Sequence, residues 1–269
     1  FRRVLFRSRT YVGDELLSRL PHLKLIAQTG KAGRHLDMQA CQRRGIAVLE
    51  TEGTAVATAE FTLLMILASL RNLIPEVGNL KAGLWQRTLG RQLHGRTLAI
   101  LGLGRIGQQV AQAAETLGAR ILVWGREASR HKAAENGWAV AASREDFFVQ
   151  ADVLCLLLRL SPQTQGYVTA QDLARMKSDA ILINTARAEL IEPGALVQAL
   201  RQGHPGFAAV DVYEQEPVLV DRHPLQDLPN CLCTPHLGFV EQDNYESYLG
   251  QAFDHINRFC SDAAAPLNK

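Results

Sequence analysis

The segment Leu98–Gly107 reads LAILGLGRIG and decides the fold. Its first half is a continuous apolar run, which predicts a buried strand, and a helix is expected to begin among the glycines that follow. At the spacing G-x-G-x-x-G, Gly102 permits a tight turn, Gly104 lets a pyrophosphate approach the backbone, and Gly107 lets helix and strand pack closely. The sequence therefore predicts a dinucleotide-binding loop. The residues expected to bind the cofactor in this loop are Gly102, Gly104, Arg105, Ile106 and Gly107.

Outward from this loop, short apolar strands alternate with amphipathic helices as far as residue 234. Such alternation predicts an α/β protein with a parallel, doubly wound sheet. The expected strands are Thr97–Leu101, Arg120–Trp124, Val153–Leu158, Ala180–Asn184, Phe207–Val212 and Cys231–Thr234.

The chain before the loop carries a long helical pattern from Thr58 to Lys81, in which Pro75 predicts a kink or break near Asn72–Ile74. The polar, glycine-containing stretch Gly83–Gly95 then predicts a domain junction. The expected domains are a dinucleotide domain, residues 94–239, and a discontinuous second domain, residues 1–93 with 240–269.

Composition limits the partners that this chain is expected to have. Lys and Arg total 29 against 27 Asp and Glu, so the net charge of +2 gives no electrostatic reason to expect nucleic acid or an anionic membrane. No apolar run approaches the roughly 18–20 residues of a membrane span. The five cysteines include no CxxC pair, so we expect neither disulfides nor a metal site, and a reducing, cytoplasmic setting. Cys231 and Cys233 fall on one face of a strand, where such side chains usually only pack.

The residues after the second strand of the sheet bear on the choice between NAD(H) and NADP(H). A dinucleotide fold normally presents an acid there to the ribose 2′-hydroxyl, but this chain has Gly125 followed by Arg126. A 2′-phosphate would be attracted by Arg126 together with Ser129 and Arg130. Glu127 leaves the alternative open, because its carboxylate can bind a 2′-hydroxyl. The sequence favours NADP(H) over NAD(H).

Three polar segments each follow a predicted strand of the sheet: residues 183–188, 209–217 and 233–238. The carboxyl ends of parallel strands line the ligand crevice, so we expect these segments to converge on the nicotinamide end of the cofactor.

At this point the sequence resembles the D-isomer-specific 2-hydroxyacid dehydrogenases, the family of phosphoglycerate dehydrogenase and glyoxylate/hydroxypyruvate reductase. The resemblance runs from about Leu20 to about Asn257. Its motifs, in chain order, are PHLKLIAQTG (21–30), AEFTLLMILASLRN (59–72), LHGRTLAILGLGRIG (93–107), LARMKSDAILINTARAELIEPGAL (173–196), AAVDVYEQEP (208–217) and NCLCTPHLGF (230–239). The resemblance implies a Rossmann-type domain inserted into a smaller flavodoxin-like substrate domain. It also implies that this substrate domain lacks its start, the strand and helix expected before about Tyr11.

The resemblance implies a catalytic set of three residues. Arg187 would hold the substrate carboxylate and polarise the reacting carbonyl, His236 would be the general acid, and Glu216 would orient His236 and stabilise its protonated form. Glu214 competes with Glu216 for that place, and the family's Glu-Pro ending selects Glu216. His223, which also lies beside a proline, is expected to be an ordinary loop residue.

The resemblance also places residues around the cofactor and the substrate. Thr185 and Ala186 would contact the cofactor, and Asp211 would lie near the nicotinamide carboxamide. The backbone of Gly30–Lys31–Ala32 would bind the substrate carboxylate, with Lys31 assisting an anionic substrate. Arg159 replaces a proline that is usual in the family, and its role stays unassigned.

The reaction implied is the reversible reduction of a small 2-oxo acid to a D-2-hydroxy acid with NAD(P)H. Glyoxylate, hydroxypyruvate and 3-phosphohydroxypyruvate all remain open, with the smaller two favoured. Two alternatives stay open: a dinucleotide-sensing regulatory protein on the same fold, and a formate- or phosphite-type dehydrogenase. By analogy with relatives, the helix from Thr58 and the stretch Leu80–Leu93 would form a homodimer interface.

Overall fold

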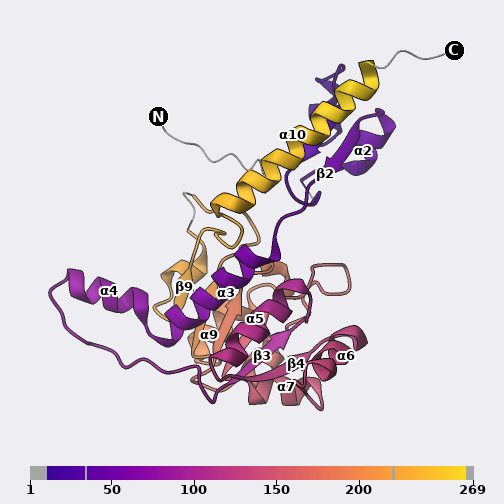
Figure 1. The fold of residues 1–269 in the computed structure, drawn as a ribbon. Helices are drawn as coiled ribbons and strands as arrows, with labels where there is room; N and C mark the ends of the chain where they lie inside the picture. The colour runs from indigo at the N-terminus through magenta and orange to yellow at the C-terminus, as the bar shows by residue number, and fades with distance from the viewer. Residues whose placement is uncertain (1–10, 34, 220–221, 265–269) are drawn as a thin grey trace. The chain divides into compact units, whose positions relative to one another are not determined.

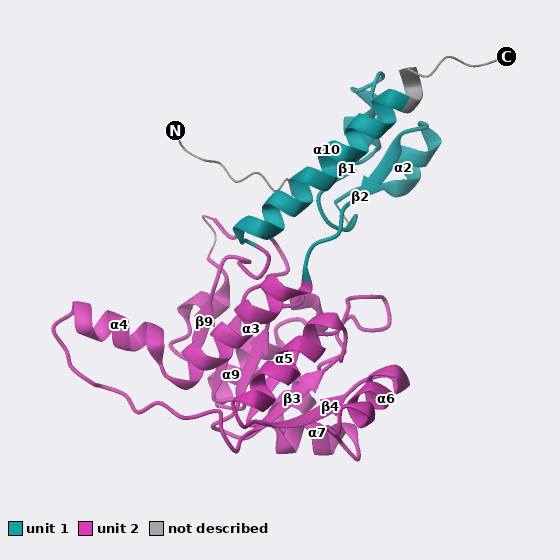
Figure 2. Ribbon diagram, viewed as in Figure 1, with its two compact units in different colours: residues 1–54, 240–269 teal, residues 55–239 magenta. Residues whose placement is uncertain are grey.

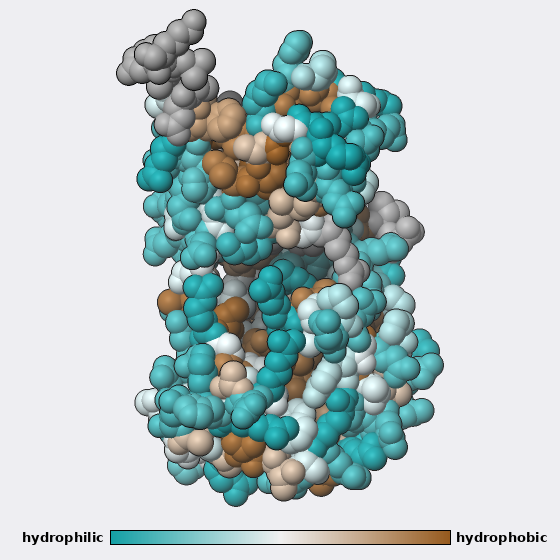
Figure 3. All heavy atoms as spheres, turned by 90° about the vertical axis from the view of Figure 1, so that its right-hand side faces the viewer, coloured by the Kyte–Doolittle hydropathy of each residue, from teal (hydrophilic) through white to brown (hydrophobic). Residues whose placement is uncertain are grey.

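The computed structural model describes residues 11–33, 35–219 and 222–264. The chain divides into two compact units, residues 1–54 with 240–269 and residues 55–239 (Figure 2). The prediction that the substrate domain lacks its first strand and helix concerns the chain before Tyr11, which lies outside the described residues. On the face drawn in Figure 3, hydrophilic residues predominate, with smaller hydrophobic areas between them.

The larger unit is built on a seven-stranded sheet in which every strand pairs in parallel (Figure 1). Its spatial order is β5-β4-β3-β6-β7-β8-β9. The chain order reverses at β3, the strand that precedes the glycine loop, and β3 lies between β4 and β6, as the first strand of a Rossmann-type sheet does. The predicted doubly wound sheet is thus confirmed. The strands are β3 (Thr97–Leu101), β4 (Arg120–Trp124), β5 (Ala139–Val140), β6 (Val153–Leu156), β7 (Ile181–Asn184), β8 (Phe207–Val210) and β9 (Cys231–Cys233).

Helices cover both faces of this sheet, so the central strands are buried on both sides. Alternate residues of β3 accordingly belong to two different hydrophobic clusters. Leu98 and Ile100 of β3 pack in one core cluster, and Ala99 and Leu101 in the other. The helices of the unit are α3 (Ala55–Leu70), α4 (Leu73–Lys81), α5 (Arg105–Thr116), α6 (Glu127–Glu135), α7 (Arg144–Gln150), α8 (Ala170–Ala174) and α9 (Ala195–Gln202), with short 3-10 helices η1 (Ala188–Leu190) and η2 (Pro224–Asp227). A strand buried on both faces needs apolar side chains on both, which is why Leu98–Leu101 of β3 reads as an unbroken apolar run.

The predicted break before Pro75 is confirmed. The helices α3 and α4 meet at an angle of 60°, and Asn72 between them has a left-handed φ of +49°. Pro75 lies in the first turn of α4, where no backbone N–H is needed for a helical hydrogen bond. No single helix among the described residues is long and apolar enough to cross a membrane, and only this bent pair together passes that test of length and composition.

The division between the units differs from the expected boundary at residue 94. It falls between Thr54 and Ala55, so α3, α4 and the stretch up to residue 93 belong to the larger unit. The reason is packing: Met65 and Ile66 of α3 lie in the same buried cluster as Val110 of α5. The larger unit ends at Phe239, and the chain returns to the smaller unit at Val240.

The smaller unit holds a two-stranded parallel sheet, β1 (Leu25–Gln28) with β2 (Ala47–Glu50). Its helices are α1 (Asp14–Ser18), α2 (Met38–Arg43) and α10 (Gln242–Ala264). The last helix joins the start of the chain through side chains, since Gln251 hydrogen-bonds the backbone of Glu52 and His255 that of Glu50. The discontinuous unit is therefore held together by contacts between the two ends of the described chain.

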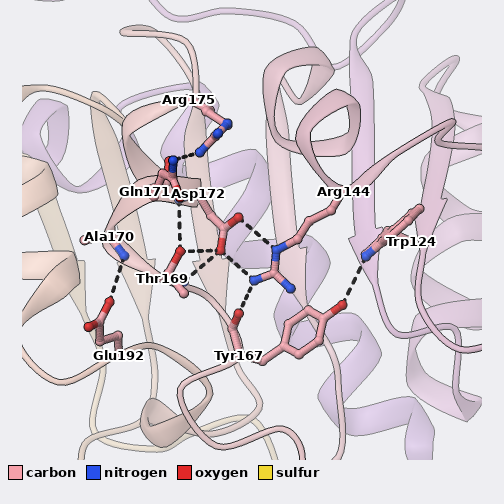
Figure 4. Close-up of polar contacts among 9 residues, drawn as sticks. All are labelled: Trp124, Arg144, Tyr167, Thr169, Ala170, Gln171, Asp172, Arg175 and Glu192. Atoms are coloured by element: carbon pink, nitrogen blue, oxygen red, sulfur yellow. Dashed lines mark hydrogen bonds and ion pairs between the residues drawn. The ribbon is translucent and has the colours of Figure 1, made fainter.

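Near the end of β4, an ion pair between Arg144 and Asp172 ties α7 to α8 (Figure 4). The guanidinium makes two hydrogen bonds to the carboxylate, at 2.9 and 2.6 Å, and a third to the backbone oxygen of Tyr167. The Tyr167 hydroxyl in turn accepts a hydrogen bond from Trp124 Nε1 at 3.1 Å. Because Trp124 is the last residue of β4, this network braces the start of the segment predicted to face the cofactor ribose.

We expect Asp172→Asn to lower the free energy of unfolding by about 2–3 kcal/mol at pH 7, because it leaves a half-buried guanidinium without its anion. Burial raises the pKa of Asp172, but the hydrogen bonds from Arg144 and Thr169 outweigh burial and hold that pKa below 3.8. A lowered folded-state pKa stabilises the protein above the unfolded-state value and loses this effect as the pH falls through the folded-state value. The difference between the two proteins should therefore shrink below about pH 4.

Urea titrations at pH 7 and pH 3 would measure this effect. Glu145→Gln is the matched control, because Glu145 pairs with Arg175 but is 67% exposed, and exposed pairs contribute less than about 1 kcal/mol. Equal losses for the two variants at pH 7 would show that the Arg144–Asp172 pair has no special weight.

Candidate active site

The three glycines of the loop after β3 differ in what surrounds them. Gly102 has a left-handed φ of +97°, and a Cβ there would lie 2.9 Å from the backbone nitrogen of Leu158. A Cβ on Gly107 would lie 2.6 Å from the oxygen of Gly102. The fold itself thus requires these two glycines.

Gly104 is different, because a Cβ built on it meets no protein atom within 4 Å and its φ of −81° suits any residue. It is the N-cap of the twelve-residue helix α5, where unpaired backbone N–H groups and the helix dipole attract an anion. Open space over a glycine at a helix N-terminus fits the pyrophosphate of a dinucleotide.

The segment after β4 places Arg126 at the N-cap of α6 with its side chain exposed. Arg130 is engaged by neighbours: its guanidinium lies 4.4 Å from the centre of the Trp124 ring, and its Nε donates to the Gly125 oxygen. Ser129 Oγ accepts a hydrogen bond from the backbone of Leu103 in the glycine loop. The predicted ribose segment and glycine loop are therefore joined directly, and both Arg126 and Glu127 lie exposed at this edge.

The structure brings His236 and Glu216 together. Nδ1 of His236 lies 2.8 Å from Oε2 of Glu216, and the two side chains are only 15% and 7% exposed. The other carboxylate oxygen of Glu216 accepts from the backbone nitrogen of Tyr213. The competing residue, Glu214, pairs instead with His223 at 2.9 Å. The structure thus places Glu216 beside His236 and Glu214 beside His223.

Asp211 fixes the turn that carries His236. Its buried carboxylate accepts hydrogen bonds from Thr234 Oγ1 at 2.6 Å and from the backbone nitrogens of Leu237 and Gly238 at 2.7 and 2.8 Å. Burial raises the pKa of Asp211, although these hydrogen bonds and the nearby His236 act against burial. His236 itself has a left-handed φ of +56°, which is uncommon for a residue other than glycine. The hydrogen bonds from Thr234, Leu237 and Gly238 to Asp211 fix the chain on both sides of this conformation.

Arg187 follows β7 at the same carboxyl edge of the sheet. The Asn184 side chain holds the segment that leads to it, donating to the Arg187 oxygen and accepting from the Ala186 nitrogen. The guanidinium of Arg187 donates a hydrogen bond to the backbone oxygen of Ala186 at 2.6 Å. Thr185 is buried, and its hydroxyl lies 2.7 Å from that of Thr62 in α3.

The predicted substrate loop belongs to the smaller unit and is partly engaged there. The backbone nitrogens of Gly30 and Ala32 donate to the side chains of Thr51 and Glu50. Lys31 pairs with Glu50 and Glu52, at 3.1 and 3.6 Å. The amides of Gly30 and Ala32 and the side chain of Lys31 are therefore all engaged within the smaller unit, and binding of a substrate carboxylate by this loop stays a prediction.

Sequence reasoning missed the residues that support the site from behind. Thr234, Asn184 and Tyr213 hold the backbone around His236, Arg187 and Glu216, and the Tyr213 hydroxyl donates to the Thr234 oxygen at 3.0 Å. The sequence could have pointed to these three residues only through their position, since each lies within three residues of a predicted catalytic residue. No group of three or more potential metal ligands occurs in the described part of the chain.

Comparisons with known proteins identify the family to which this chain is similar. Residues 63–238 match the family profile described as D-isomer specific 2-hydroxyacid dehydrogenase, NAD binding domain. The chain is 35% identical over 262 residues to a glyoxylate reductase of Aeropyrum pernix, covering 94% of this chain and 78% of that protein. It is 32% identical to D-3-phosphoglycerate dehydrogenase of Bacillus subtilis, covering 96% of this chain but only 49% of that protein. The chain therefore spans about half the length of that longer relative.

Among solved structures, a phosphoglycerate oxidoreductase of Vibrio cholerae O395 is similar, with 50% sequence identity and a TM-score of 0.91. The match covers 95% of this chain and 82% of that one. Similarity in sequence and in fold thus extends over nearly all of the chain, beyond the glycine loop.

Proposed function

The chain belongs to the D-isomer specific 2-hydroxyacid dehydrogenase family, and we propose that it transfers a hydride between a nicotinamide dinucleotide and a small 2-oxo acid. The observation that carries the proposal is the His236–Glu216 pair, set in the same unit as a glycine loop with open space over Gly104. A dinucleotide-sensing protein needs the loop but has no use for a buried, carboxylate-paired histidine.

Each residue has a distinct task in the proposed reaction. The dinucleotide, when bound, supplies or accepts the hydride. Arg187 binds the carboxylate of the 2-oxo acid through its planar fork of donors and polarises the neighbouring carbonyl. His236 gives a proton from Nε2 to the carbonyl oxygen, because its Nδ1 is directed to Glu216. Glu216 fixes the ring and stabilises its positive charge, and Asp211 keeps the turn in place.

A panel assay tests the proposal. Purified protein is mixed with NADPH or NADH and with glyoxylate, hydroxypyruvate, pyruvate or 3-phosphohydroxypyruvate, and cofactor oxidation is followed. We expect turnover with at least one of the small 2-oxo acids, glyoxylate and hydroxypyruvate first. Dinucleotide binding without turnover of any 2-oxo acid would favour the regulatory alternative. In a parallel assay with NAD+ or NADP+, cofactor reduction by formate or phosphite, with no 2-oxo acid reduced in the first assay, would favour the neighbouring chemistry.

We propose NADP(H) as the preferred dinucleotide, because Arg126 lies exposed at the N-cap of α6 and Gly125 stands where an acid is expected. Arg126→Gln should lower kcat/KM for NADPH by about 10–100-fold, the loss of one charge-assisted hydrogen bond pair, and leave kcat/KM for NADH nearly unchanged. Lys132→Gln, on the same helix, is the matched control. An unchanged ratio of the two cofactors in Arg126→Gln, or a wild-type preference for NADH, would remove this part of the proposal.

We also propose a homodimer, formed through an apolar surface on α3, α4 and the segment after them. Large apolar side chains there are exposed: Leu64, Leu67, Leu73, Ile74, Val77, Leu80, Leu84, Trp85 and Leu89. Trp85 is 73% and Leu89 94% exposed, and burial of such a surface is the main driving force of association. Sedimentation equilibrium should report a dimer for the wild type and a monomer for the Trp85→Ser/Leu89→Ser double variant. A monomeric wild type would contradict the proposal.

A further inference from the structure

The strand β9 presents two thiols to each other at the edge of the sheet. Cys231 Sγ and Cys233 Sγ lie 3.7 Å apart, and both side chains are half-buried. The strand pairs with β8 only, so one of its edges has no neighbouring strand in the sheet. The other three cysteines lie elsewhere, in α2, β6 and α10. Among the cysteines of the described chain, this pair brings two sulfur atoms within hydrogen-bonding distance of each other.

The surroundings of the pair favour reaction at Cys233. The hydrogen bond from Cys231 lowers the pKa of Cys233, although burial acts in the opposite direction. The same interaction, together with burial, raises the pKa of Cys231. The thiolate is the form that reacts with peroxides, so Cys233 is the more reactive member and Cys231 is the resolving thiol.

We infer that Cys231 and Cys233 form a peroxide-oxidised dithiol whose disulfide lowers turnover at the His236 site, an inference that rests on the proposed function. In the first step the Cys233 thiolate attacks hydrogen peroxide, the O–O bond breaks, and a sulfenic acid and hydroxide form. In the second, the Cys231 thiol attacks that sulfur and the hydroxyl leaves. The sum is two thiols and one hydrogen peroxide giving one disulfide and two waters.

Closure of this disulfide must change the strand. The sulfur atoms have to approach from 3.7 Å to about 2.0 Å. Residues two apart in an extended strand have Cα atoms about 6.6 Å apart, whereas the commonest Cα separation across a disulfide is about 5.5–6 Å. An unstrained disulfide therefore shortens the strand, and within the sheet β9 is paired on one side alone, with β8.

A shortened strand pulls on the catalytic turn. Thr234 follows Cys233 directly, donating its N–H to the Val210 oxygen and its hydroxyl to Asp211. Asp211 in turn holds the two residues after His236. Movement of Thr234 thus reaches His236 through contacts on both sides of that residue, and a displacement of about 1 Å at a catalytic group can cost up to roughly a hundredfold in rate.

The test reads the thiols and the turnover separately. Protein treated with hydrogen peroxide is alkylated and digested with trypsin, and the peptide His223–Arg258, whose sequence contains both cysteines and no other, is analysed by mass spectrometry. We expect a loss of two hydrogen atoms, no alkylation, and a fall in kcat of roughly tenfold or more that dithiothreitol reverses. Cys231→Ser and Cys233→Ser should keep their kcat under peroxide, and Cys260→Ser, an exposed lone thiol, should behave as the wild type.

Two results would overturn the inference. A treated peptide that still takes up two alkyl groups would show that no disulfide forms. A disulfide that forms without a fall in kcat would show that it does not act on the site. The mass measurement does not depend on turnover, so a disulfide in a protein that reduces no 2-oxo acid would count against the proposed function and leave the dithiol chemistry standing.

Discussion

Replacing His236 with asparagine should lower kcat by about 10²–10⁴-fold, the usual contribution of a positioned general acid. Asparagine is the appropriate replacement because it tolerates the left-handed backbone that His236 adopts, with φ of +56°. It also keeps a hydrogen-bonding group beside Glu216 but has no proton to give at neutral pH. Binding of the dinucleotide, measured by fluorescence titration, should stay within a factor of about two, since His236 acts on the substrate.

The chain supplies a matched control in its second His–Glu pair. His223 lies 2.9 Å from Glu214 but outside the set formed by Asp211, Glu216 and His236. His223→Asn should therefore leave kcat nearly unchanged. If both variants kept wild-type turnover, or if both lost it equally, His236 would not be the proton donor.

Replacing Arg187 with lysine should have the second large effect, a fall in kcat/KM of about 10²–10³-fold. Lysine keeps the positive charge but cannot make the two parallel hydrogen bonds that a guanidinium makes to a carboxylate. The loss is expected in KM for the 2-oxo acid and also in kcat, because Arg187 is proposed to polarise the reacting carbonyl as well as to bind the carboxylate. Steady-state kinetics with hydroxypyruvate or glyoxylate measures both parameters.

Arg201→Lys, at an exposed arginine in the last turn of α9, controls for general effects of the substitution and should change neither. Wild-type kinetics in Arg187→Lys would show that charge alone is sufficient at this position and that the planar geometry has no role.

Local rules predicted the centre of this fold well. The strand Thr97–Leu101 and the glycines after it follow from hydrophobic burial and from turn geometry, which act over a few residues. The break at Asn72 follows likewise from the missing N–H of Pro75. The elements missed include the short helix α1, the strand β5 and the helix α7. The strand β5 has only two residues, both exposed, and gives no pattern to detect. Helix α7 did carry a signal, because Ser143 caps it by accepting from the Asp146 nitrogen.

The features that could not be predicted from the sequence depend on contacts between residues far apart in the chain. The boundary before Ala55 depends on α3 packing against α5, two helices that the chain separates by more than thirty residues. In the sequence, the choice of Glu216 over Glu214 rested on the family resemblance alone. The structure adds a distance criterion, because Glu216 lies beside His236 and Glu214 lies beside His223. The support of the His236 turn by Asp211 also joins residues far apart in the chain, and no spacing rule predicts it.

Isotope tracing tests hydride transfer most directly. NADPH carrying deuterium at both positions of nicotinamide C4 is incubated with the wild-type protein and hydroxypyruvate, and the glycerate formed is analysed by mass spectrometry and chiral chromatography. The expected product is D-glycerate with one deuterium on C2, formed at a strongly reduced rate by His236→Asn. Glycerate without deuterium on C2, or the L isomer, would contradict direct hydride transfer at this site to give a D-2-hydroxy acid.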